Sequence, residues 1–134
     1  MALSSTSSFP AADRSRKDAR VLLLDDDEGF RSALAENLRD DGFAVIEYST
    51  ARELPPLTAL GEIRVVVTDY DMPGTDGLAF AESFRAAYPS VPIIMVTGCC
   101  TVNLEDLAAA RGVCLLRKPL EYEQLHSLLH RLPA

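Results

Sequence analysis

The sequence contains no tryptophan, only three cysteines and only two histidines among its 134 residues. Two of the cysteines are adjacent, Cys99 and Cys100, and the third is Cys114, so they show neither a disulfide framework nor the spacing of a metal-binding motif. This cysteine usage favours a reducing compartment and predicts a cytoplasmic protein. A chain of this length buries roughly two-thirds of the surface that its unfolded form exposes, so it needs no disulfide or metal to fold.

Long apolar runs and a surplus of basic residues are absent as well. No apolar run approaches the roughly 20 residues that cross a bilayer, and residues 1–10 lack the positive start and apolar stretch of a secretion signal. Thirteen Lys and Arg residues stand against twenty Asp and Glu residues, a formal net charge of −7. Because that charge repels nucleic acid backbones and anionic lipid, we expect neither nucleic acid nor a membrane as a direct partner.

The sequence predicts a disordered leader over residues 1–18, which are rich in Ser, Ala and charge, and one folded domain over residues 19–132. Within that domain, apolar β-branched runs alternate with segments of helical periodicity, the pattern of an α/β fold with a five-stranded parallel sheet. The runs are apolar throughout, as expected where helices cover both faces of the sheet. The predicted strands are residues 21–24, 44–48, 65–68, 93–96 and 114–116.

Five helices are predicted between and after these strands. They cover residues 28–41, 51–61, 77–87, 102–110 and 121–132. The second should be short, bent or broken, because Pro55 and Pro56 remove two backbone donors and disfavour helix in the residue before them. Asp76 directly precedes the third helix and is a candidate N-cap.

Four of the five predicted strands end in polar residues that suit phosphoryl chemistry. In an open α/β sheet, ligands bind at the carboxyl ends of the strands, so side chains far apart in the sequence are expected to meet there. The second strand carries only Ser49 and Thr50 at its end. The other strand ends carry Asp25, Asp26 and Asp27 after the first, Asp69 after the third, Thr97 after the fourth, and Arg117, Lys118 and Pro119 after the fifth.

Carboxylates gathered at one sheet edge need positive charge between them. Each close contact between two carboxylates costs on the order of 4 kcal/mol at an effective dielectric constant near 20. Mg²⁺ suits one or two carboxylates together with a substrate phosphate, and Lys118 adds a second positive charge. Thr97 offers a hydroxyl donor, while Pro119, whose peptide bond can be cis, would aim the lysine inward. A nucleophilic carboxylate, a metal site and two phosphate partners match the needs of phosphoryl transfer.

Four sequence motifs together resemble the response-regulator receiver domain of two-component signalling. The segments are Leu22 to Asp27, Thr68 to Gly77, Met95 to Gly98 and Arg117 to Pro119, and the resemblance extends over about residues 19–132. Each motif is weak alone, but the four stand in the family's order and at its intervals. The resemblance, which is to chemotaxis receivers in particular, implies a doubly wound, flavodoxin-like sheet of order 2-1-3-4-5.

The same resemblance assigns roles to individual residues. It implies that Asp69 accepts a phosphoryl group from a phosphohistidine of a histidine kinase or histidine phosphotransfer protein in a phosphorelay. Mg²⁺ would be bound by Asp25, Asp26, Asp69 and the backbone carbonyl of Asp71. The remaining two side chains that contact the phosphoryl group would be Thr97 and Lys118.

Phosphorylation in this family implies a changed surface for a downstream protein target. The expected face consists of the fourth helix, the fifth strand and the fifth helix. The resemblance also implies that the domain promotes its own phosphorylation and dephosphorylation without being classed as an enzyme. Two positions depart from the family pattern. Leu115 stands where receivers often carry an aromatic residue that swings inward, and Thr75 stands where an apolar residue usually packs.

Other interpretations of these residues remain open. A phosphohydrolase of the haloacid dehalogenase type also has an Asp-x-Asp motif after a strand, as at Asp69 and Asp71, but that family places its acidic metal pair after the lysine. A degenerate receiver that only docks partners is the second alternative. His126 and His130 have the spacing of paired metal ligands on a helix, yet no third ligand is indicated, and two partly exposed helix residues are the favoured interpretation.

Overall fold

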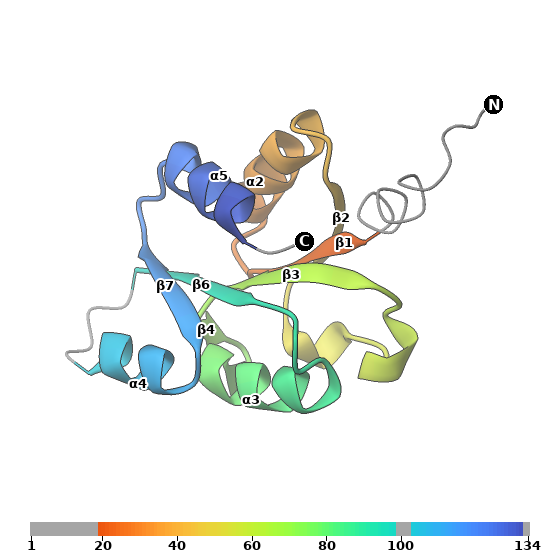
Figure 1. Cartoon of the computed structure of the whole chain (residues 1–134), viewed down its shortest axis with the longest axis vertical. Coiled ribbons are helices and arrows are strands. Elements are labelled where there is room, and N and C mark those ends of the chain that lie inside the picture. Colours follow the sequence, from red (N-terminus) through yellow and green to blue (C-terminus); the bar gives the residue numbers. More distant parts are fainter. Residues whose placement is uncertain (1–18, 99–102, 133–134) are drawn as a thin grey trace.

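Five parallel strands of apolar residues form the centre of the computed structural model, which describes residues 19–98 and 103–132 (Figure 1). The predicted leader therefore lies outside the described residues. The strand order β2-β1-β3-β6-β7 confirms the expected order 2-1-3-4-5. The strands are β1 (Arg20–Leu24), β2 (Ala44–Tyr48), β3 (Ile63–Thr68), β6 (Ile93–Thr97) and β7 (Val113–Arg117).

The described residues include four α-helices that cover both faces of the sheet. They are α2 (Glu28–Asp40), α3 (Gly77–Ala87), α4 (Leu104–Ala110) and α5 (Tyr122–Arg131). Figure 1 shows α2 and α5 on one face and α3 and α4 on the other. The side chain of Asp76 accepts a hydrogen bond from the Ala79 backbone N–H at 2.7 Å, so the predicted cap of α3 is present. Asp27 caps α2 in the same way.

The expected second helix consists of two short 3-10 turns, η1 (Ala51–Glu53) and η2 (Leu57–Ala59). Pro55 and Pro56 lie between them, where the missing backbone donors and the extended conformation that proline favours in its predecessor interrupt a helix. The prediction that this element is short or broken is therefore confirmed. Its side chains still close one edge of the core, because Leu57 packs against the buried cluster beneath β3.

The hydrophobic core consists of two layers, one on each face of the sheet. Alternate residues of β1 point to opposite faces: Leu22 and Leu24 join the layer under α3 and α4, and Val21 and Leu23 join the layer under α2 and α5. All four are almost completely buried. Each such side chain contributes about 1.5–3 kcal/mol of transfer free energy, and burial on both faces explains why these strands carry no polar alternation.

A short antiparallel hairpin follows β3, in a segment for which the sequence predicted neither a strand nor a helix. It consists of β4 (Asp71–Met72) and β5 (Thr75–Asp76), and Gly74 takes a φ of +86° at its turn. The Thr50 hydroxyl donates to the Pro73 carbonyl at 3.1 Å, and the side chain of Arg52 packs over Gly74. The hairpin is therefore fastened to η1, which holds the segment after β3 in place.

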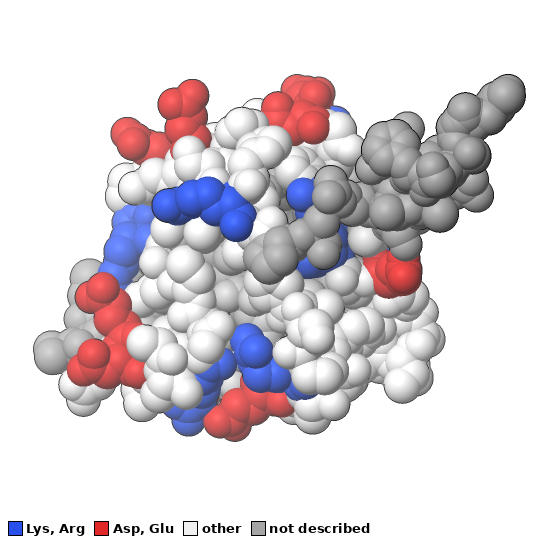
Figure 2. All heavy atoms as spheres, in the orientation of Figure 1, with Lys and Arg blue, Asp and Glu red and all other residues white. Residues whose placement is uncertain are grey.

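The charged residues are mixed on the face of the molecule drawn in Figure 2. Lys and Arg side chains lie in separate groups there, with Asp and Glu beside and between them. Elsewhere charges of opposite sign pair directly, as Arg39 and Glu47 do at 3.1 Å. In the described part of the chain, no helix is both long and apolar enough to cross a membrane.

Candidate functional site

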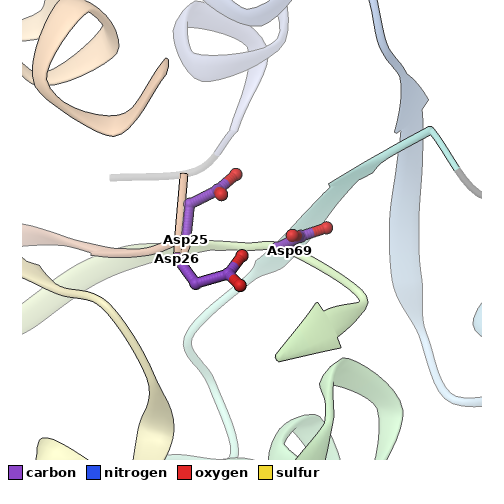
Figure 3. Close-up of side chains that lie close together, drawn as sticks. All are labelled: Asp25, Asp26 and Asp69. Carbon is purple, nitrogen blue, oxygen red and sulfur yellow. The ribbon is translucent and has the colours of Figure 1, made fainter. Parts of the chain in front are cut away.

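The carboxyl ends of β1 and β3 bring three carboxylates together. Asp25 and Asp26 directly follow β1, and Asp69 directly follows the neighbouring strand β3. Figure 3 shows the three side chains gathered at this edge of the sheet, and one oxygen from each lies within 4.8 Å of the others. Oxygen ligands at this spacing suit a hard divalent cation. Residues separated by more than forty positions thus meet as the strand pattern predicts.

Asp25 is held in place by contacts to both carboxylate oxygens. Its side chain is buried; Oδ1 accepts the Asp27 backbone N–H at 2.9 Å, and Oδ2 accepts Lys118 Nζ at 3.0 Å. The Asp25 backbone carbonyl also accepts the Arg31 guanidinium at 2.7 Å. Asp26, in contrast, is exposed. Asp25 is therefore a fixed member of the cluster, whereas Asp26 presents its carboxylate to solvent.

Asp69 lies at the buried centre of the site, with 7% of its surface exposed. Burial raises the pKa of its carboxyl group, and the negative charge of Asp25 raises it further. Lys118 and the backbone N–H groups of Asp71 and Tyr70 act in the opposite direction. The net upward shift means that burial, together with the charge of Asp25, disfavours the ionised form of Asp69, a cost that a bound cation would offset.

Lys118 is directed toward the carboxylates by the end of β7. Its backbone N–H donates to the Thr97 carbonyl at 2.9 Å, and its peptide bond to Pro119 is cis, as the sequence allowed. Its ammonium lies 3.0 Å from Asp25 Oδ2 and 3.9 Å from Asp69 Oδ2. Thr97 itself is buried at the end of β6, so the structure places both predicted phosphate partners at the same edge.

Phe30 belongs to this site, although the sequence placed it only within the predicted helix over residues 28–41. The Lys118 ammonium lies 4.4 Å from the centroid of the Phe30 ring, within the range of a cation–π interaction. The available signal was an aromatic residue four positions after Asp26, in the first turn of the helix that follows the acidic residues. The resemblance assigned only the backbone carbonyl of Asp71 to the metal. Its side chain is exposed, and its carboxylate is not part of the three-member cluster.

Replacing Asp69 with Asn is expected to raise the free energy of unfolding at pH 7 without Mg²⁺. The folded-state pKa is raised above the ordinary value of 3.8, so the ionised carboxylate costs stability above the folded pKa. That cost disappears as the pH falls through the folded pKa toward 3.8, because Asp69 then becomes neutral. Urea unfolding at pH 7 and pH 4 measures the difference. A variant that is less stable at pH 7, or an equal gain at both pH values, would contradict this assignment.

The fold and the site define a doubly wound α/β domain with an acidic, lysine-containing pocket at the carboxyl ends of its strands. A family model described as the response regulator receiver domain matches residues 21–130. The chain belongs to this family, whose members are phosphoacceptor signalling domains of two-component systems. The predicted resemblance to a receiver domain is thereby confirmed, together with the general prediction of a phosphoacceptor signalling domain.

Individual relatives agree with this assignment. The response regulator protein FleR of Pseudomonas aeruginosa is 32% identical over 114 residues, which cover 84% of this chain and 24% of that protein. The chain thus spans about a quarter of the length of such curated relatives. The solved chemotaxis protein CheY4 of Vibrio cholerae is 28% identical, with a TM-score of 0.76 over 86% of this chain and 98% of its own.

A third relative was solved in a modified form. It is a response regulator protein from Burkholderia pseudomallei with a phosphorylated aspartic acid, a calcium ion and citrate, and it is 25% identical to this chain. The two structures superpose with a TM-score of 0.75 over 84% of this chain and 66% of that chain.

Proposed function

We propose that Asp69 accepts a phosphoryl group from a phosphohistidine of a histidine kinase or histidine phosphotransfer protein. The observation that carries this assignment is the position of the Asp69 carboxylate, buried beside Asp25 and 3.9 Å from Lys118 at the shared strand edge. The chain would act in the cytoplasm as a phosphorelay module and pass its signal to a protein target. It would promote its own phosphorylation and dephosphorylation without acting as an enzyme on other substrates.

We propose Mg²⁺ as the cofactor, bound by Asp25, Asp26, Asp69 and the backbone carbonyl of Asp71. The donor set fits, because three carboxylate oxygens within 4.8 Å are hard ligands with excess negative charge. When bound, Mg²⁺ supplies charge neutralisation for the oxygens of the transferring phosphoryl group. The calcium ion in the Burkholderia relative supports a divalent cation in this family.

The covalent step forms one bond and breaks one. An Asp69 oxygen attacks phosphorus, while the phosphorus–nitrogen bond of the donor histidine breaks and its electron pair returns to the imidazole. The product is an acyl phosphate on Asp69. Lys118, which pairs with Asp25 before transfer, lies near enough to Asp69 to pair with a phosphoryl oxygen afterwards. The Thr97 hydroxyl is the second partner that we assign to the phosphoryl group.

We assign the output surface to α4, β7 and α5, the face expected from the sequence. Thr97 ends β6, which pairs with β7 along its whole length, so a shift at Thr97 reaches β7 directly. Arg117 at the end of β7 forms an ion pair with Glu105 of α4 at 3.6 Å, which joins these two elements. Leu115 of β7 packs against the core layer under α3 and α4, where it supplies apolar contact in place of an aromatic ring.

Incubation with acetyl phosphate and Mg²⁺ tests this function. We expect intact mass spectrometry to show one phosphate added to the wild type, none without Mg²⁺, and none on Asp69→Asn. Rapid multiple turnover of phosphate esters would instead indicate a hydrolase of the haloacid dehalogenase type. The absence of any Mg²⁺-dependent modification, by acetyl phosphate or by a phosphorylated kinase, would indicate a docking module without phosphoacceptor activity.

A further inference from the structure

The two histidines of the chain meet on the exposed side of α5. His126 and His130 are one helical turn apart, and their Nε2 atoms lie 3.1 Å from each other. Asp41, which follows α2, places its Oδ2 atom 3.4 Å from His126 Nε2. Sequence spacing could not reveal this third group, because Asp41 is 85 residues before His126. The three side chains converge from two different elements.

Two of the three pairwise separations are those of ligands around one tetrahedral metal ion, whereas Asp41 Oδ2 and His130 Nε2 lie more than 4.8 Å apart. Zn²⁺ binds imidazole nitrogen and carboxylate oxygen at about 2.0–2.2 Å, so neighbouring ligand atoms in a tetrahedral site lie about 3.3–3.5 Å apart. The nitrogen pair at 3.1 Å and the nitrogen–oxygen pair at 3.4 Å are close to that spacing. Histidines at positions i and i+4 of a helix are also a recognised zinc-binding arrangement.

We propose that His126, His130 and Asp41 bind one divalent transition-metal ion of the zinc class, with water completing the coordination. About one-third to two-fifths of the Asp41 and His126 side chains is exposed, so an ion can reach the site from solvent. Binding requires a rotation of the Asp41 carboxylate toward His130. Imidazole ligands favour zinc over the magnesium that suits an all-oxygen cluster.

Groups around the site support metal binding. The Tyr122 hydroxyl donates to Asp41 Oδ2 at 2.7 Å, and this hydrogen bond keeps the carboxylate beside α5, within reach of His126. The Phe43 and His130 rings pack edge to face, with their centroids 6.5 Å apart.

The site is separate from the carboxylates at Asp25. Asp27 begins α2 beside that cluster, whereas Asp41 follows the last of the thirteen residues of α2, about 20 Å farther along the helix axis. A bound ion would join the end of α2 to α5, a helix of the proposed output surface. The metal at this site therefore belongs to a different chemical class and a different part of the molecule from the proposed Mg²⁺.

Zinc titration of the full chain in saturating Mg²⁺ tests the site, with Mg²⁺ filling the carboxylate cluster. Isothermal calorimetry is expected to show one Zn²⁺ per chain, at least tenfold weaker affinity in His126→Gln or His130→Gln, and several-fold weaker affinity in Asp41→Asn. Glu123→Gln, which removes a carboxylate from the same helix outside the cluster, should bind as the wild type does. Far-ultraviolet circular dichroism verifies that each variant folds.

Cobalt(II) identifies the ligand type in the same experiment. We expect weak d–d absorption bands of a nitrogen and oxygen site, without the intense thiolate-to-cobalt band that the cysteines would give. The proposal fails if no zinc binds beyond the Mg²⁺ cluster, if the double variant His126→Gln, His130→Gln binds zinc as tightly as the wild type, or if Glu123→Gln weakens binding as much as the histidine variants do.

Discussion

An Asp26→Asn variant is expected to bind Mg²⁺ more than tenfold more weakly and to lose most of its phosphoryl uptake from acetyl phosphate. Both carboxylate oxygens of Asp25 already accept hydrogen bonds, from Lys118 and from the Asp27 backbone. Asp26 is exposed and contributes one of the three oxygens within 4.8 Å. The Asp26 carboxylate is therefore the one most readily available to bind the cation. A tenfold loss of Mg²⁺ affinity corresponds to about 1.4 kcal/mol of binding free energy. Calorimetric titration with Mg²⁺ measures this change in affinity.

Asp27→Asn is the matched control for this variant. It makes the same change in charge at the adjacent residue, but the Asp27 side chain caps α2 by accepting the Phe30 N–H at 3.1 Å and is not a member of the cluster. Asn is as good an N-cap as Asp, so stability should be preserved. Equal losses of Mg²⁺ affinity in the two variants would mean that general negative charge, and not Asp26 as a ligand, attracts the cation.

Gly77→Ala is expected to lower the free energy of unfolding by about 2–3 kcal/mol and to slow phosphorylation. A Cβ atom at Gly77 would overlap the Asp69 carbonyl oxygen and lie 2.9 Å from Tyr70 Cα, and both are backbone atoms that cannot move aside alone. The Gly77 N–H also donates to the Tyr70 carbonyl at 2.6 Å. The first residue of α3 thus packs directly against the backbone of Asp69, the proposed phosphoacceptor, and a methyl group there would displace it. Urea unfolding measures the stability change.

Gly29→Ala provides the comparison within another helix. A Cβ atom at Gly29 has no neighbour closer than 3.6 Å, and Ala has the higher helix propensity, by up to about 1 kcal/mol in a helix interior. We expect unchanged or slightly increased stability and normal phosphorylation. A Gly77→Ala protein as stable and as reactive as Gly29→Ala would show that the close approach of α3 to Asp69 has no functional importance.

The features predictable from the sequence are those fixed by local pattern. Runs such as Val65 to Val67 specify buried strands because apolar β-branched residues pack on both faces of a parallel sheet. Strand ends then place Asp69 beside Asp25 through topology alone. Capping by Asp76 and interruption at Pro55 follow from the hydrogen-bonding capacity of single residues.

The features that sequence analysis missed depend on side chains that meet across the fold. The cation–π contact of Lys118 with Phe30 and the approach of Asp41 to His126 join residues 88 and 85 positions apart, which no periodicity reveals. The hairpin at Asp71 was missed because strands of two residues are too short to show an alternating pattern.

Chemical mapping of the phosphorylated residue tests the central claim most directly. Sodium borohydride reduces an aspartyl phosphate to homoserine, which tandem mass spectrometry locates in the peptide chain. After incubation of the wild type with acetyl phosphate and Mg²⁺, we predict homoserine at residue 69 and no conversion at residues 25, 26, 27 or 71. Homoserine at one of those other positions, or a phosphate adduct that borohydride leaves unchanged, would contradict the assignment of Asp69 as the phosphoacceptor.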